Sequence, residues 1–127
     1  MKRDSKVLLD DVIKASDEIR EYTAGMDLLA YQENRVRRRA VERCFTIIGE
    51  ALIKLRKHDP DLTARLGDPR EIVDFRNFLT HGYHKVDDRE VWDIIRDDLP
   101  VLHETAIDLQ KGLEPESLPP SSPGPRI

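Results

Sequence analysis

The stretch DFRNFLTHGYHKVDD, residues 74–88, brings together four side chains suited to acid–base and phosphate chemistry: Arg76, Asn77, His81 and Tyr83. A histidine that titrates near neutrality can take a proton from an attacking 2′-hydroxyl or give one to a leaving oxygen. A guanidinium can hold the extra negative charge of a pentavalent phosphorane through paired hydrogen bonds. These residue types suit RNA cleavage without a metal ion, with Arg76 and His81 as the reacting pair and Asn77 as an accessory.

A regular helix does not bring this pair together, because residues five apart lie about 140° apart around the axis. Arg76 and His81 meet only if the helix unwinds near Gly82, or if a second copy faces the first across a two-fold axis. The motif also fits an ordinary helix end, where Arg and His stabilise the free carbonyls. A zinc site at His81 and His84 is disfavoured because no cysteine and no clear third ligand stands nearby.

Apolar residues recur at three- and four-residue spacing along most of the chain, which predicts an all-α fold. A first helix is expected to open at Asp4 or Ser5 and to stop at Gly25. Asp27 can restart a helical segment, and a second long helix is expected from about 33 to 57. Its predicted buried side comprises Val36, Ala40, Cys44, Ile47, Ile48, Ala51 and Leu55.

The polar motif stands at the end of a third predicted helix. Asp68, followed by proline and then Glu71, forms a capping box that starts this helix. Asp87 repeats the start signal for a last long helix, which should kink near Pro100 because proline cannot donate its backbone hydrogen bond. The sequence therefore predicts an antiparallel bundle of four to five helices, joined by short connections.

Composition limits what else the protein can be. The chain has 127 residues, enough for one core, with 39% apolar and 36% charged residues. We expect a helical domain over residues 1–112 and a disordered Pro/Ser-rich tail over 113–127, which holds five of the eight prolines. The net charge of −4 makes any RNA contact local, and a single cysteine fits a reducing compartment. With no long apolar run, we expect a cytoplasmic protein without a membrane span.

Three segments in order give the chain a family resemblance. The motif R-N-x-L-x-H-G-Y, residues 76–83, resembles that of the HepT-like branch of the HEPN superfamily, the toxin half of HepT–MntA toxin–antitoxin pairs. IIGEA at 47–51 resembles the helix-two signature of that family, and VDDREVWDIIRDDLPVL at 86–102 its final helix. The opening segment 4–25 also fits. Relatives often carry a tryptophan shortly before the motif, which this chain lacks, and we interpret the difference as a packing change.

The resemblance implies a homodimer in which both Arg–His motifs line a shared cleft. It implies an endoribonuclease that cuts tRNA or mRNA with Arg76 and His81, without a metal ion or cofactor. It also implies a cognate MntA-like nucleotidyltransferase antitoxin that transfers AMP from ATP onto Tyr83. Such a modification would add bulk and negative charge beside the arginine and so repel RNA.

The densest basic run, Arg35 to Arg43, admits two interpretations. Its members Arg35, Arg37, Arg38 and Arg39 could line an RNA path or meet an acidic partner. They could equally form a solvated helix face paired with glutamates such as Glu42. Glu50 admits two interpretations as well, because it could bond to a motif side chain across the bundle or point outward. Trp92 is better interpreted as a core residue than as a base-stacking platform.

Two further function classes compete with the nuclease. A catalytically silent helical module could bind and regulate a nucleotidyltransferase or a nucleotide, although the intact motif favours catalysis. A DNA-binding regulator is disfavoured by the net acidity and by the lack of a helix-turn-helix signal.

Overall fold

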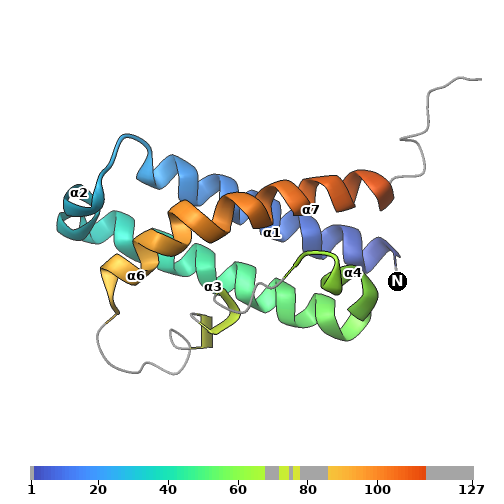
Figure 1. Ribbon diagram of the computed structural model, residues 1–127. Helices are drawn as coiled ribbons and strands as arrows, with labels where there is room; N and C mark the ends of the chain where they lie inside the picture. Colours follow the sequence, from blue (N-terminus) through green and yellow to red (C-terminus); the bar gives the residue numbers. More distant parts are fainter. Residues whose placement is uncertain (1, 68–71, 75, 78–85, 114–127) are drawn as a thin grey trace, which may run out of the picture.

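The computed structural model of the protein describes residues 2–67, 72–74, 76–77 and 86–113. Every regular element among these residues is a helix (Figure 1), which confirms the all-α prediction. The capping box at Asp68 and the motif residues His81 and Tyr83 lie outside the described residues. The predicted dimer stays a prediction.

Of the three long helices, α1 (Lys2–Thr23) lies beside both α3 (Arg35–His58) and α7 (Leu99–Leu113) (Figure 1). Helix α1 runs antiparallel to both of the others. Shorter helices complete the described part: α2 (Leu28–Glu33), α4 (Pro60–Ala64), α6 (Asp88–Asp93) and the π-helical turn η1 (Ile94–Asp98). Residues 72–74 and 76–77 are also helical and carry the start of the polar motif.

Polar contacts at both ends of the bundle fix this antiparallel arrangement. The Ser5 hydroxyl donates to Asp59 Oδ2 over 3.3 Å, which joins the start of α1 to the end of α3. Arg37 Nη1 donates to the Tyr22 carbonyl over 2.9 Å, which joins the opposite ends. The expected helix start at Asp4 or Ser5 is wrong, because α1 already begins at Lys2 and both residues lie inside it, with Ser5 buried.

Local capping chemistry sets the boundaries of the shorter helices, as the sequence predicts for Asp27 and Asp87. The side chains of Asp27, Asp59 and Asp87 accept hydrogen bonds from the first backbone N–H groups of α2, α4 and α6. Gly25 lies in the turn between α1 and α2, where its φ of 76° is a left-handed backbone conformation that glycine adopts without strain. Just before Pro100, where the sequence predicts a kink, the chain forms the π-helical turn η1, in which the N–H group of Leu99 bonds to the carbonyl of Ile94.

One core runs through the bundle. The predicted side of α3 buries Cys44, Ile48, Ala51 and Leu55, whereas Ala40 and Ile47 are half-buried. Val36 does not belong to that core, because its side chain is 78% exposed. It lies in the first turn of α3, at the end of the bundle. The helical repeat places Val36 on the predicted buried side, but the neighbouring helices do not extend far enough to cover it.

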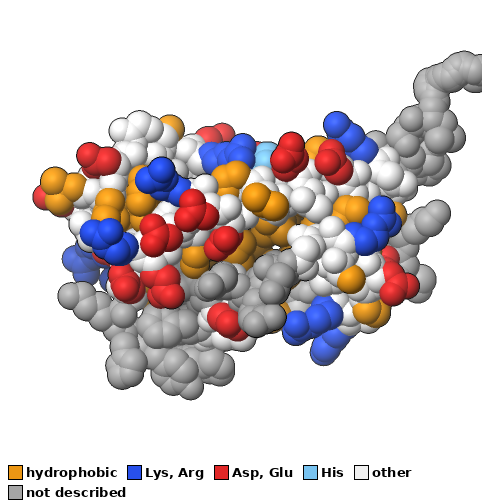
Figure 2. Space-filling model, in the orientation of Figure 1, with side chains coloured by type: hydrophobic (Ala, Val, Ile, Leu, Met, Phe, Trp, Pro, Cys, Tyr) orange, Lys and Arg blue, Asp and Glu red, His pale blue; other side chains and the backbone are white. Residues whose placement is uncertain are grey.

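The face of the molecule drawn in Figure 2 mixes both signs of charge. Figure 2 shows Lys and Arg side chains interspersed with Asp and Glu on the face in view, so that face carries no large field of one sign. Among the described helices, none is long and apolar enough to cross a membrane.

Candidate functional site

The first motif residue, Arg76, packs directly against α3 at Gly49. The backbone of Gly49 is buried, and a methyl group placed there would overlap the Cβ and Cγ atoms of Arg76. Any residue with a side chain would therefore push the Arg76 segment away from α3. Because Gly49 of the IIGEA segment has no side chain, Arg76 can pack in close contact with α3. The next residue, Glu50, lies beside the Arg76 guanidinium.

Two acceptors hold the Arg76 guanidinium. Its Nη1 atom donates to Asn77 Oδ1 over 3.0 Å, and its Nη2 atom donates to Glu50 Oε2 over 3.4 Å. The Arg76 side chain is 20% exposed and that of Glu50 is 44% exposed, so the pair stands at the surface of the bundle. The Nε atom is buried and has no hydrogen-bond partner among the described residues. A guanidinium carries five N–H donors, so Arg76 keeps capacity for an anion.

The structure decides one question that the sequence left open. Glu50 points to the motif and bonds to Arg76, so the interpretation in which it faces only solvent is wrong. Asn77 contacts Arg76 as well, and both are half-buried. The joint action of Arg76 and His81, the accessory role of Asn77 and the modification of Tyr83 stay predictions.

The basic run of α3 is partly occupied by contacts within the chain. Arg37 bonds to the carbonyl of Tyr22, and Arg39 lies 3.8 Å from a Glu42 carboxylate oxygen. Arg38 lies 3.6 Å from Asp88 Oδ2, with only 26% of its side chain exposed. Arg35 and Arg43 are exposed and make no ion pair with the described residues. An RNA-binding role for this run stays a prediction, and Arg38 is its least accessible member.

Arg38 belongs to a polar cluster that the sequence did not reveal. Around it lie Tyr31 of α2, Glu42 of α3 and Asp88 at the start of α6, with the Tyr31 hydroxyl buried and without a hydrogen-bond partner among the described residues. Burial raises the pKa of the Tyr31 phenol, and the charges of Glu42 and Asp88 add to the effect. Burial likewise raises the pKa of Glu42. The cluster holds α6 to α3 at the point where the chain returns from the motif segment.

The described residues contain no group of three or more His, Cys, Asp or Glu side chains that could hold a metal ion. Cys44 is buried, and burial together with the nearby Glu18 raises the pKa of its thiol to about 12. It is therefore an inert core residue and not a nucleophile.

Comparison with known proteins adds a family to this geometry. The family model described as "Ribonuclease HepT-like" matches residues 12–109. A Methanocaldococcus jannaschii protein provisionally named as an RNase is 33% identical over 101 residues, or 78% of this chain and 90% of its own. A second, similarly named protein of that organism is 31% identical over 113 residues, or 89% and 97%. A Thermococcus cleftensis protein named "Probable ribonuclease HepT" is 33% identical over 105 residues, or 80% and 92%. No solved structure matches the chain.

Proposed function

The chain belongs to the HepT-like ribonuclease family, and from that premise we propose that it is a metal-independent endoribonuclease whose site is built on Arg76 and His81. The observation that supports this proposal best is the placement of Arg76. Gly49 leaves room for the Arg76 side chain against α3, and Asn77 and Glu50 each accept a hydrogen bond from the Arg76 guanidinium. A cation that is fixed before the substrate arrives needs little reorganisation when charge develops on the phosphate.

In the proposed reaction the 2′-hydroxyl of the RNA attacks the adjacent phosphorus. His81 serves as the proton carrier: one histidine takes the hydroxyl proton and another gives a proton to the departing 5′-oxygen. Arg76 binds the non-bridging oxygens and stabilises the phosphorane. The products are a 2′,3′-cyclic phosphate and a 5′-hydroxyl, so no water is consumed in this step, and Arg76 and His81 take the roles that a metal ion would otherwise fill. Two copies of the chain, facing each other across a two-fold axis, would supply both histidines.

The first test is cleavage of a labelled RNA by the wild-type protein and by Arg76→Ala and His81→Ala, with EDTA present throughout. Each variant should lose at least about 100-fold in rate, the scale of losing one transition-state contact. An RNA with a 2′-deoxy sugar at the cleaved position should stay intact. Arg56→Ala, an exposed residue near the end of α3, is the matched control.

Two results would contradict the proposed site. Variants that cleave as fast as the wild type would remove Arg76 and His81 from the mechanism. Wild-type protein that arrests no growth and leaves RNA intact would favour instead the silent regulatory module.

Regulation by a partner enzyme is the second part of the proposal. A cognate nucleotidyltransferase antitoxin transfers AMP from ATP to the hydroxyl oxygen of Tyr83 and releases pyrophosphate. The added phosphodiester carries negative charge close in sequence to Arg76, and it would repel the phosphates of RNA. Incubation with the partner and ATP should raise the mass of the wild type in AMP steps but not that of Tyr83→Phe. An equal mass increase in the Phe variant would show that another residue is the acceptor.

A further inference from the structure

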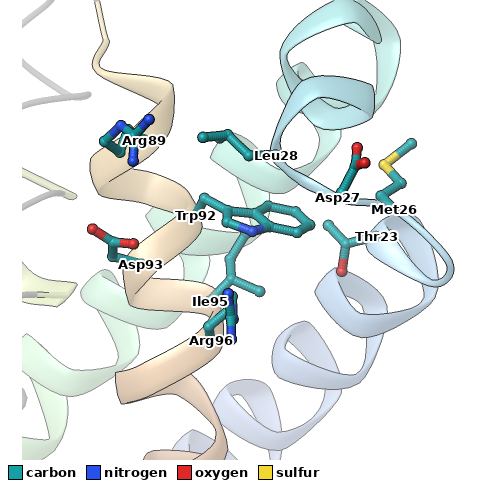
Figure 3. A pocket seen from close by; sticks show the side chains of 9 residues that line it. All are labelled: Thr23, Met26, Asp27, Leu28, Arg89, Trp92, Asp93, Ile95 and Arg96. Carbon is teal, nitrogen blue, oxygen red and sulfur yellow. The ribbon is translucent and has the colours of Figure 1, made fainter.

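A second site candidate lies at the end of the bundle, away from Arg76. A groove of about 530 Å³ opens there between the turn that follows α1 and one face of α6 and η1 (Figure 3). Its volume falls in the range of small-ligand sites. The lining residues are Thr23, Met26, Asp27, Leu28, Arg89, Trp92, Asp93, Ile95 and Arg96.

Trp92, the only tryptophan of the chain, forms the aromatic part of this groove. Its ring packs against that of Tyr31, with centroids 5.3 Å apart and planes inclined by 36°. Tyr31 is fully buried, so it supports the indole from the core side. Trp92 itself is half-buried, and Figure 3 shows the indole extending across the groove toward Thr23 and Met26. Trp92 therefore packs against the core with one part of its side chain, as expected from the sequence, and lines the groove with another part.

Two arginines flank the indole along the helix axis. Figure 3 shows Arg89 on one side of Trp92 and Arg96 on the other. Both residues are exposed, and neither makes an ion pair with the part of the chain that the structure describes. Seven helical residues span roughly 10 Å. That separation leaves room for the indole, and for a ring stacked on it, between two cations.

The two carboxylates of the groove are placed differently. Asp27 Oδ1 accepts a hydrogen bond from the Ala30 backbone over 2.8 Å, so it caps α2. Asp93 extends from the other side of α6, away from the indole (Figure 3). The two charged side chains that flank the indole, Arg89 of α6 and Arg96 of η1, are therefore positive, although the groove as a whole is balanced.

We propose that this groove binds an unpaired base of RNA, stacked on Trp92, with Arg89 and Arg96 bonded to the phosphates on either side of that base. Aromatic rings that stack on bases, combined with arginines that track the backbone, are the general chemistry of single-strand binding. The inference rests on the proposed function, because it takes RNA to be the substrate.

The groove is a separate subsite and not an extension of the Arg76 site. Arg38 holds the start of α6 to α3, whereas Glu50 holds Arg76 further along the same helix. Those two positions of α3 are twelve residues apart, which corresponds to about 18 Å along the axis. A strand that occupies both sites must therefore span several nucleotides, so the subsite would select longer single strands over dinucleotides.

The sole tryptophan makes the test direct. Short single-stranded RNA is titrated into the Arg76→Ala protein, which keeps the RNA uncut, while indole fluorescence and the anisotropy of labelled RNA are recorded together. We expect fluorescence quenching by single-stranded RNA and much weaker quenching by a duplex of the same sequence. Adding Arg89→Gln and Arg96→Gln should weaken binding roughly 10-fold. The slope of log affinity against log salt should fall by about 1.4, because two phosphate contacts are lost.

A second groove supplies the matched control. It measures about 500 Å³, has no Phe, Tyr or Trp in its lining and contains Arg20 and Lys111. The double change to Gln at these two positions removes the same charge, and it should leave quenching and affinity nearly unchanged.

Three outcomes would overturn the inference. One is the absence of indole quenching by single-stranded RNA, whether or not the anisotropy of the labelled RNA reports binding. Another is equal weakening by the two double variants. The third is stronger quenching by an acidic peptide than by RNA, which would identify the groove as a protein-docking surface. Cleavage by the wild type is scored separately, so failure of the nuclease proposal and failure of this subsite give different results.

Discussion

Replacing Gly49 by alanine tests the packing that places Arg76. A methyl group at this position would overlap Arg76 Cβ and Cγ and would lie 3.3 Å from Cδ. The overlapping atoms stand next to the backbone, so a rotamer change cannot remove the collision. The segment that carries Arg76 must move away from α3 as a unit.

The expected size of the effect follows from the contact geometry. Carbon atoms rest about 3.5–4.0 Å apart, so relief of the overlap requires a shift of roughly 1 Å or more. Overpacking of this kind costs about 1–3 kcal/mol, while alanine regains about 1 kcal/mol of helix propensity over glycine. The net stability change should therefore be small, from about 0 to 2 kcal/mol of destabilisation. If Arg76 is the catalytic group that we propose, a displacement of about 1 Å should lower RNA cleavage roughly 100-fold.

The assay compares kcat for RNA cleavage and urea unfolding of Gly49→Ala with those of Gly112→Ala. Gly112 lies in α7 with nothing within 4 Å of the position a Cβ would occupy, so its alanine variant changes helix propensity alone. We expect Gly112→Ala to keep full activity. If Gly49→Ala also kept full activity and gained stability, the close approach of Arg76 to α3 would not position the catalytic cation.

Three other changes follow from the described contacts. Glu50→Gln keeps an acceptor for Arg76 but loses its charge; kcat should fall by no more than about tenfold, with little change in melting temperature because the pair is half exposed. The Cys44 thiol, with its pKa near 12, should react with a disulfide reagent at pH 8 only as fast as the protein unfolds; rapid native-state labelling would contradict its burial. Burial raises the pKa of the Glu42 carboxyl above its ordinary value of 4.5, so the folded protein binds the Glu42 proton more tightly than the unfolded chain does. The free energy of unfolding should therefore fall as the pH rises above 4.5. Glu42→Gln should therefore melt at a higher temperature than the wild type at pH 7 and lose this advantage below pH 4.5; a constant difference across this range would refute the assignment.

Features that depend on neighbouring residues could be predicted from the sequence. The helix starts at Asp27 and Asp87 are examples, because an N-cap side chain bonds to backbone groups only two or three residues away. The prediction for Val36 failed for the complementary reason. Helical periodicity reports which side of a helix a residue occupies, but it does not report where the opposing helices end.

Contacts between distant segments needed the structure. The His103 ring lies 2.7 Å from Asp17 although 86 residues separate them, and no local pattern links these positions. Arg38 looked like one member of a basic run, yet it pairs with Asp88 on another helix. Glu50 was an intermediate case: the sequence left open whether it contacts the motif across the bundle or points outward, and the structure shows the contact with Arg76.

The Glu50–Arg76 pair also bears on how this acidic protein would hold RNA. A carboxylate beside the guanidinium fixes its position but offsets its charge, so Arg76 attracts a ground-state phosphate less than an unpaired arginine would. In the proposed reaction the phosphorane carries more charge than the phosphate, so the fixed cation would favour the transition state over the bound substrate. Affinity must then come from elsewhere on a chain of net charge −4, and several arginines of α3 are already engaged within the chain. If Arg76 stabilises the transition state and other arginines supply affinity, loss of Arg76 should lower kcat more than it raises KM. Loss of Arg89 and Arg96 should instead raise KM and leave kcat nearly unchanged.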